Sequence, residues 1–180
     1  MDDSDETLMV RIGRGDEAAF RLLSRRHLRS VVALARHITG NAADAEDVAQ
    51  DAMLRVWTHA PRWQPLASFK TWLTRIVVNL CLDRKRRRVI LPIEAAGDPA
   101  DEAPDARERM ERSEIDRHVA AAIDGLPERQ RAAIVLTYRE GLSNAEVADI
   151  LGSSVSAVET LLVRAKQRLR TQLRPDEEAD

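Results

Sequence analysis

The chain has 180 residues, of which 44% are hydrophobic, 32% charged and only 3% aromatic, and its formal net charge at pH 7 is −2. This composition is typical of a water-soluble protein with an aliphatic core. No apolar run approaches the roughly 20 residues of a membrane span, and the amino terminus is acidic where a signal peptide is basic. No segment shows the alternating β-branched pattern of a strand. We therefore expect an all-α, cytoplasmic protein without membrane insertion.

The charges divide the chain into segments. Residues 1–88 carry 16 Lys and Arg against 11 Asp and Glu, residues 89–108 carry 1 against 6, residues 109–174 carry 11 against 9, and residues 175–180 carry 0 against 4. Residues 89–108 also contain three prolines and too few apolar side chains to offset their ordering entropy, so we predict a flexible acidic linker. Two small helical domains, residues 1–88 and 109–174, are expected around it, with an acidic tail at 175–180.

The first domain opens with two predicted helices, residues 8–14 and 16–36. The second has Asp16 in position to cap it and apolar side chains at helical spacing. His27 and His37 have no partner at metal-ligand spacing in that helix, so we interpret both as structural. A third helix is predicted over residues 41–59. One face of it mixes carboxylates with large apolar side chains, and this face contains Asp47, Gln50, Asp51, Met53, Leu54 and Trp57. The mixture suits a protein-binding patch, but packing against a neighbouring helix would produce the same pattern.

A loop at residues 60–67, which contains Trp63 and two prolines, leads into a predicted helix over residues 68–88 with Ser68 as its N-cap. The helical period predicts one packed stripe, and this stripe contains Phe69, Trp72, Leu73, Ile76 and Leu80. Arg75, Asn79, Asp83 and Arg84 are predicted to lie off that stripe. The helix ends in five consecutive cations, which fit either a solvated end or a nucleic-acid surface. Cys81, the single cysteine, is interpreted as a small semi-buried side chain, with a redox sensor as the alternative.

In the second domain, one helix is predicted to end at Gly125 and the next to run from Pro127 to Gly141. Ser143 and Glu146 have the spacing of a capping box at the start of a short helix. A turn at Gly152 and a long helix over residues 155–173 follow. This order is a helix-turn-helix signature. The small Ala148 is predicted to let the two helices cross closely, with Val158 and Leu162 packing the long helix against the short one. The outward face of the long helix has short polar residues first and cations behind them, which favours DNA reading over a plain antiparallel helix pair.

These blocks resemble bacterial RNA polymerase sigma factors of the extracytoplasmic-function class, within the sigma-70 family. DAEDVAQDAMLRVW and SFKTWLTRIVVNLCLDRKRRR are similar to region 2, and LPERQRAAIVLTYREGLSNAEVADILGSSVSAVETLLVRAKQRLR is similar to region 4. The resemblance covers residues 10–174. It implies an alternative initiation factor that binds core RNA polymerase, directs it to promoter DNA and is controlled by an anti-sigma factor.

The resemblance also implies roles for individual residues. Contacts to the clamp helices of the largest polymerase subunit are implied for Asp47, Gln50, Asp51, Met53 and Trp57, and region 4 is expected to contact the polymerase flap. Minus-ten recognition and melting are implied for Trp63, Ser68, Lys70, Arg75, Asn79, Asp83 and Arg84. Minus-thirty-five recognition is implied for Ser154, Ser156, Ala157, Glu159, Thr160, Arg164, Lys166 and Arg168. Relatives usually have a basic residue where this chain has Glu159, and a carboxylate there predicts a contact to a cytosine amino group.

Two other functions fit parts of the sequence. GLSNAEVADILG and the helix after it are also close to the helix-turn-helix output domains of two-component and quorum-sensing regulators, whose upstream domains are usually α/β. A helical adaptor that never touches DNA is the other possibility. An enzyme is not expected, because the four histidines are scattered and the sequence has no phosphate loop or cluster of catalytic side chains. We likewise predict no metal site and no cofactor.

Overall fold

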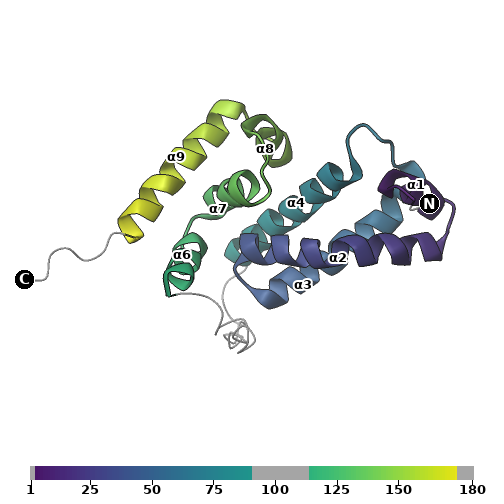
Figure 1. Ribbon diagram of the computed structural model, residues 1–180, viewed down its shortest axis with the longest axis horizontal. Coiled ribbons are helices and arrows are strands. Elements are labelled where there is room, and N and C mark those ends of the chain that lie inside the picture. The colour runs from purple at the N-terminus through teal and green to yellow at the C-terminus, as the bar shows by residue number, and fades with distance from the viewer. Residues whose placement is uncertain (1–2, 91–113, 174–180) are drawn as a thin grey trace, which may run out of the picture. The chain divides into compact units, whose positions relative to one another are not determined.

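The computed structural model describes residues 3–90 and 114–173, so the predicted linker from residue 91 onward and the acidic tail lie outside it. Within these two ranges every regular element is a helix, which confirms the predicted all-α fold class. The chain divides into two compact units, Met1–Ile90 and Leu91–Asp180 (Figure 1). Each unit is described separately.

Unit 1 contains α1 (Asp5–Ile12), α2 (Glu17–Thr39), α3 (Ala42–His59), a short 3-10 turn η1 (Ala60–Arg62) and α4 (Phe69–Ile90). The three long helices lie side by side and contact one another, while α1 contacts α2 and η1 (Figure 1). Their shared core is aliphatic, with Phe69 as its largest fully buried side chain. The outer surfaces of α3 and α4 are therefore supported by the same core.

The helices of unit 1 begin at short polar side chains. Asp16 Oδ1 accepts hydrogen bonds from the backbone N–H groups of Ala18 and Ala19, which confirms its predicted capping role. Asn41 Oδ1 caps α3 in the same way. Ser4 Oγ accepts a bond of 3.2 Å from the Thr7 N–H, so α1 begins at Asp5 rather than at the predicted residue 8.

The buried face of α4 differs from the predicted stripe. Phe69, Leu73 and Leu80 are buried as predicted, but Val77, Val78 and Cys81 are buried as well, whereas Trp72 and Ile76 are only half-buried. The predicted stripe followed one helical spacing through Trp72 and Ile76, whereas the buried face is turned towards Val77 and Val78. At about 100° per residue, this rotation places Arg84 in line with Leu73, Val77 and Leu80. The prediction that Arg84 lies off the buried face is therefore wrong.

The end of α4 is also later than predicted. Its backbone continues to Ile90, so Val89 and Ile90 belong to the helix and not to the linker. The side chains beyond Arg84, which include the rest of the predicted basic run, lie outside the described part of the chain.

Unit 2 contains α6 (Glu114–Asp124), α7 (Glu128–Ile134), a π-helical turn η2 (Val135–Arg139), α8 (Asn144–Leu151) and α9 (Val155–Gln172). The predicted capping box is confirmed, because Ser143 Oγ accepts from the Glu146 N–H and Glu146 Oε2 accepts from the Ser143 N–H at 2.8 Å. Gly152 then adopts the left-handed conformation, with φ 57° and ψ 45°, that ends α8. The turn before α9 is thus the predicted helix-turn-helix turn.

The two helices of this motif are held by close packing and by backbone capping. Val158 is fully buried, and Leu162 and Ala148 are nearly so, which agrees with their predicted positions between α8 and α9. Arg129 on α7 donates a bond of 3.2 Å to the Leu151 carbonyl at the end of α8. The buried Arg131 donates to the carbonyl oxygens of Asp124 and Leu126, which fixes the turn between α6 and α7.

Candidate functional site

The outer face of α3 presents acidic and amide side chains around one exposed leucine. Asp47, Gln50 and Asp51 are exposed, and Leu54 between them is 60% exposed. Because residues three, four and seven apart share one side of a helix, these side chains form a single surface. We call it the α3 face and define it by Asp47, Gln50, Asp51 and Leu54. The sequence showed Leu54 on this face, but the predicted binding set omitted it.

Two residues of the predicted polymerase-binding set lie at the edge of that surface. Met53 and Trp57 are half-buried, and the Trp57 ring meets the Phe20 ring of α2 edge-on, with 5.2 Å between centroids. The packing interpretation from the sequence is therefore confirmed for Trp57, and the protein-binding interpretation stays a prediction. It packs on a neighbouring helix and leaves part of its ring beside the α3 face.

Arg84 joins α4 to α3 through two carboxylates. Its Nε donates a bond of 2.9 Å to Asp44 Oδ1, and its Nη2 pairs with Asp47. Partial burial opposes the charge of Arg84, but the two carboxylates outweigh it and hold the pKa of Arg84 above its ordinary value. Asp47 thus belongs both to the α3 face and to an ion pair with α4.

Three other polar residues of α4 form a row on its other side. Asn79 and Asp83 are exposed and Arg75 is half-buried, and a spacing of four residues places them about 40° apart around the helix. Trp72 lies at the head of the same row, with its ring centroid 6.3 Å from that of His59 and 5.9 Å from that of Phe69. The helical spacing assigned Trp72 to the packed stripe, but its side chain is only half-buried. We call Trp72, Arg75, Asn79 and Asp83 the α4 row.

The loop of residues 60–68, which includes η1, lies at the amino-terminal end of that row. Trp63 is half-buried and Leu66 is 90% exposed. Ser68 Oγ accepts a bond of 3.2 Å from the Thr71 N–H, so the predicted DNA contact is in this structure the N-cap of α4. Lys70 is exposed in the first turn. The loop therefore places an aromatic ring close to the start of the α4 row, whereas Lys70, two residues before Trp72, lies about 160° from it around the helix.

The exposed side of α9 contains most of the predicted minus-thirty-five set. Ser156, Glu159, Thr160 and Arg164 are exposed, while Ala157 is half-buried. Ser154 Oγ is used as the N-cap and accepts from the Ala157 N–H at 3.2 Å. This arrangement matches a recognition helix whose first turns present small polar side chains.

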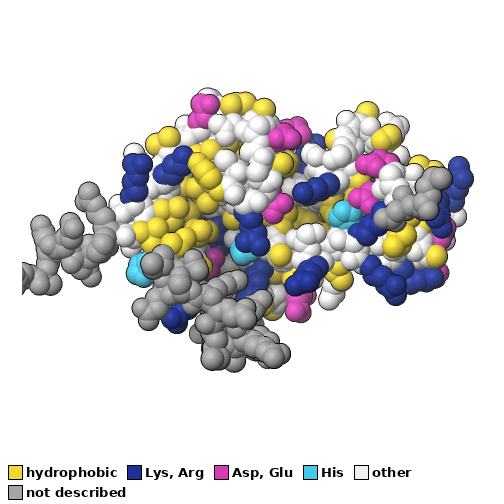
Figure 2. Space-filling model, in the orientation of Figure 1, with side chains coloured by type: hydrophobic (Ala, Val, Ile, Leu, Met, Phe, Trp, Pro, Cys, Tyr) yellow, Lys and Arg dark blue, Asp and Glu magenta, His cyan; other side chains and the backbone are white. Residues whose placement is uncertain are grey.

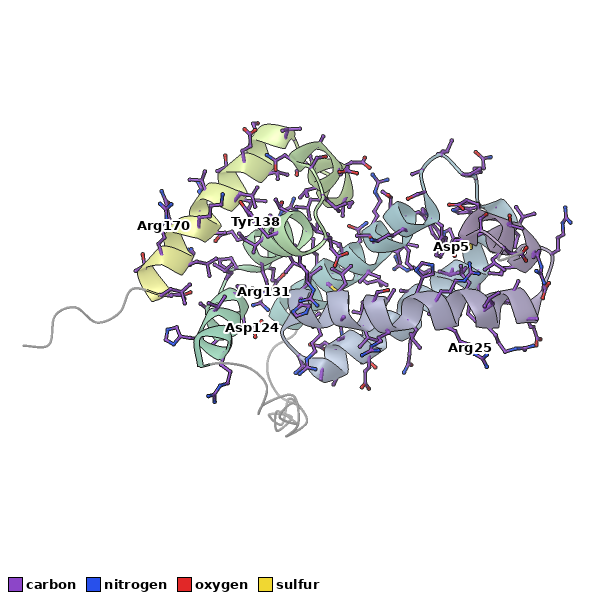
Figure 3. The ribbon with its side chains drawn as sticks, in the orientation of Figure 1. Asp5, Arg25, Asp124, Arg131, Tyr138 and Arg170 are labelled. Atoms are coloured by element: carbon purple, nitrogen blue, oxygen red, sulfur yellow. The ribbon has the colours of Figure 1, made fainter. Side chains whose placement is uncertain are left out.

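The two rear cations of the predicted set separate around α9. Lys166 and Arg168 are both exposed, but their spacing places them about 160° apart, on opposite sides of the helix. Lys166 Nζ lies 5.1 Å from the centroid of the exposed Tyr138 ring, the geometry of a cation–π contact (Figure 3). Arg164 is thus the cation nearest the middle of the exposed side.

A basic surface on α2 was not assigned from the sequence. Arg21, Arg25 and Arg29 are exposed and recur every four residues, so they share one side of the helix. Figure 2 shows Lys and Arg side chains gathered over α2 on this side of unit 1. Figure 3 shows Arg25 directed outward from α2. The four-residue spacing was a visible signal in the sequence.

Residues 3–90 and 114–173 contain neither a metal-ligand cluster nor a membrane-spanning helix. Three or more His, Cys, Asp or Glu side chains do not come together there in a way that could hold a metal ion. None of the helices in these ranges is long and apolar enough to cross a membrane.

Comparison with known proteins agrees with this layout. Residues 23–89 match the family model for sigma-70 region 2, and residues 117–169 match that for sigma-70 region 4. The chain is 37% identical over 166 residues to the ECF RNA polymerase sigma factor SigE of Mycolicibacterium smegmatis, with 88% of this chain and 64% of SigE covered. It is also 37% identical to the ECF sigma factor SigM of Mycobacterium tuberculosis, with 92% of this chain and 83% of SigM covered.

Among solved structures, that of CnrH in complex with the cytosolic domain of CnrY superimposes with a TM-score of 0.67 at 29% identity, and covers 98% of this chain and 100% of that one. A region 2 helical unit followed by a region 4 helix-turn-helix unit defines a sigma-70-type initiation factor. The chain belongs to the extracytoplasmic-function class of RNA polymerase sigma factors.

Proposed function

We propose that this chain binds core RNA polymerase through the α3 face, opens the minus-ten element with the residue 60–68 loop and the α4 row, and reads the minus-thirty-five element with α9. The observation that carries this proposal is the arrangement of unit 1. There, an acidic and apolar face on α3 and a polar row on α4 lie on two helices that pack together. One surface can remain on the polymerase while the other holds DNA.

The minus-ten step is supported by the chemistry of the loop and the row. Extruding a base costs a few kcal/mol of stacking, which aromatic stacking and contacts to the backbone must offset. Trp63 and Trp72 supply half-exposed rings, and Asn79 supplies an amide that can both donate and accept. Lys70, in the first turn of α4 and outside the row, supplies an exposed cation. We assign Arg84 mainly to anchoring α4, because its guanidinium is already held by Asp44 and Asp47.

For the minus-thirty-five step, we propose that Glu159 accepts a hydrogen bond from a cytosine amino group in the major groove. Glu159 is exposed one turn into α9, beside Ser156 and Thr160. Selection of bound promoter variants by wild type and by Glu159→Ala tests this contact. The variant is expected to lose the preference for cytosine at one position, and an unchanged preference would contradict the assignment.

We further propose a regulatory protein partner of the anti-sigma type. CnrH, which resembles this chain over its full length, was solved in complex with the cytosolic domain of another protein, CnrY. A partner that covered the α3 face would block polymerase binding directly. The chain would act in the cytoplasm, where polymerase and promoter meet, and the chemistry of RNA synthesis would be the polymerase's rather than this chain's.

Purified core polymerase tests the proposed function. We expect promoter-specific transcripts from a genomic template library only when this chain is added, and mapping of their start sites would give the promoter sequence. Leu54→Glu is expected to abolish this activity, because it places a charge at the centre of the α3 face. Leu28→Glu, on an exposed leucine of α2, is the matched control.

The same experiment separates the other two functions. A regulator of the two-component output type would require a sigma factor already bound to the polymerase, and an adaptor would give no promoter-specific transcript. The regulator is not favoured by the fold, because residues 3–90 form a helical unit in which residues 23–89 match region 2, where such a protein has a receiver or ligand-binding domain.

A further inference from the structure

Helix α1 contacts both ends of the loop that we assign to the minus-ten element. The loop leaves α3 at η1 and enters α4 at Phe69. Residues 5–12 precede the part of the chain that matches the region 2 family model, which begins at residue 23. That family model therefore assigns no role to α1.

The first contact is a cap supplied from α1 to α4. Glu6 Oε1 accepts a hydrogen bond of 3.2 Å from the backbone N–H of Phe69, the first residue of α4. Ser68 caps a different N–H group of the same helix end, that of Thr71. The first amides of a helix have no partner within the helix, so Glu6 satisfies one that Ser68 does not reach. The Glu6 carboxylate is held by its own backbone N–H and by that of Phe69, and these bonds lower its pKa.

The second contact is a close approach at the other end of α1. A Cβ atom on Gly13 would lie 2.7 Å from the Ala60 carbonyl oxygen and 3.3 Å from the Pro61 Cα. The backbone of Gly13 has φ −59° and ψ −17°, which any residue can adopt. Glycine is therefore needed here by the nearness of η1 and not by the local conformation.

α1 is itself fixed to α2 by buried apolar groups and by an ion-pair cluster. Leu8 and Met9 are fully buried. The Asp5 carboxylate, which points from α1 towards α2 (Figure 3), lies 3.1 Å from Arg26 Nη1 and 2.7 Å from His27 Nε2. The His27 ring in turn meets Phe69 edge-on, with 5.1 Å between centroids. The anchor of α1 and the first residue of α4 are thus in direct contact.

From these contacts we infer that α1 is a brace that fixes the residue 60–68 loop at both ends for capture of the unpaired minus-ten strand, with Glu6 and Gly13 as its positioning residues. Glu6 and Gly13 are about 10 Å apart along a rigid helix. A rigid link of this kind limits how far the two loop ends can separate. The inference rests on the proposed function, because it assumes that the loop binds the single strand.

The test uses holoenzyme reconstituted from core polymerase and the full chain. Its probe is a fluorescent single-stranded oligonucleotide that carries the non-template minus-ten sequence of a mapped promoter. Glu6→Ala and Gly13→Ala are each expected to weaken oligonucleotide binding about fivefold, the factor that corresponds to about 1 kcal/mol. Their affinity for core polymerase, which is measured separately, is expected to stay within about twofold of wild type, because the α3 face is unchanged.

Two matched variants sharpen the result. Glu6→Gln keeps an oxygen acceptor for the Phe69 N–H and is expected to bind the oligonucleotide nearly as wild type does. Glu17→Ala removes another glutamate from the first turn of a helix, but its carboxylate contacts only Arg21 on the same helix at 3.4 Å in the described structure. No effect of Glu17→Ala is expected on either affinity.

Two outcomes would overturn the brace. Unchanged oligonucleotide binding by both Glu6→Ala and Gly13→Ala would show that the loop does not depend on α1. A parallel loss of core affinity and oligonucleotide affinity would show that α1 only helps unit 1 to fold. Trp63→Ala separates these results from failure of the proposed function. If that variant binds the oligonucleotide normally, the loop does not hold the strand and the minus-ten assignment itself is wrong.

Discussion

The ion pair between α4 and α3 gives a sharp prediction about Arg84. The Arg84 side chain is 35% exposed, Asp44 only 13% and Asp47 52%. Replacing Arg84 by alanine leaves the Asp44 carboxylate poorly hydrated and without that partner. A hydrogen bond to a charged group contributes about 1.5–3 kcal/mol, and fully exposed pairs contribute about 0–1 kcal/mol. We expect Arg84→Ala to lower the free energy of unfolding of unit 1 by about 2 kcal/mol.

The exposures also predict how this loss divides between the two carboxylates. In double-mutant cycles with Asp44→Asn and Asp47→Asn, we expect a coupling energy of about 1–2 kcal/mol between Arg84 and Asp44. The coupling with Asp47 should be below about 0.5 kcal/mol and should fall further in 1 M salt, because water screens an exposed pair.

Urea titration followed by tryptophan fluorescence measures these quantities in the full chain. All three tryptophans, Trp57, Trp63 and Trp72, lie in unit 1, so the signal does not report on unit 2. A coupling to Asp44 below about 0.3 kcal/mol, or a larger coupling to Asp47 than to Asp44, would refute the reasoning. Promoter opening adds a second readout. If Arg84 acts by anchoring α4, Asp44→Asn impairs opening as Arg84→Ala does, and if Arg84 binds DNA directly, only Arg84→Ala does so.

Three further predictions concern single residues. Burial and the charge of Asp44 raise the pKa of Cys81 to about 12. Its thiol should therefore resist iodoacetamide at pH 8 and react once urea unfolds unit 1. Fast labelling of the folded chain would contradict this prediction. Gly152→Ala should destabilise unit 2 by about 1–2 kcal/mol, because the left-handed conformation is unfavourable for a residue with a Cβ. No other atom lies within 4 Å of the added Cβ, so no steric clash increases this cost. Thermal melts followed by circular dichroism measure the change. The Ser143 N–H and hydroxyl lower the pKa of Glu146, so its contribution to stability is complete above its unfolded value of 4.5 and is lost as the pH falls through the folded value. Urea midpoints of wild type should therefore fall more steeply than those of Glu146→Gln as the pH is lowered from 5 to 3, and parallel curves would disprove the linkage.

The features that sequence predicted well are those that depend on neighbouring residues. The Asp16 cap, the Ser143 and Glu146 capping box and the left-handed Gly152 each involve groups within a few positions of one another. Their geometry follows from local stereochemistry, which repeats in every helix start and end. The helix-turn-helix and the order of the other helices followed from the same signals together with the apolar period.

The features that the sequence did not predict depend on packing between distant segments. The bond between Glu6 and Phe69 joins residues 63 positions apart, and that between Arg84 and Asp44 joins residues 40 positions apart. The buried face of α4 was misjudged for a related reason. A stripe centred on Trp72 or one centred on Val77 satisfies the helical period equally well, and only the contacts with α2 and α3 decide between them.

The two carboxylates that hold Arg84 differ in a way that matters for binding to polymerase. Asp47 is half-exposed and lies on the α3 face, so a partner that contacts this face can engage its second oxygen or draw it away from Arg84. Asp44 is nearly buried and keeps its 2.9 Å bond to Arg84 Nε without Asp47. Docking through Asp47 is therefore compatible with an α4 that stays anchored. The α4 row and the loop end at Phe69 are carried by that same helix. The DNA-binding geometry that we propose for unit 1 can therefore be kept if the α3 face exchanges a regulatory protein for core polymerase, as we also propose.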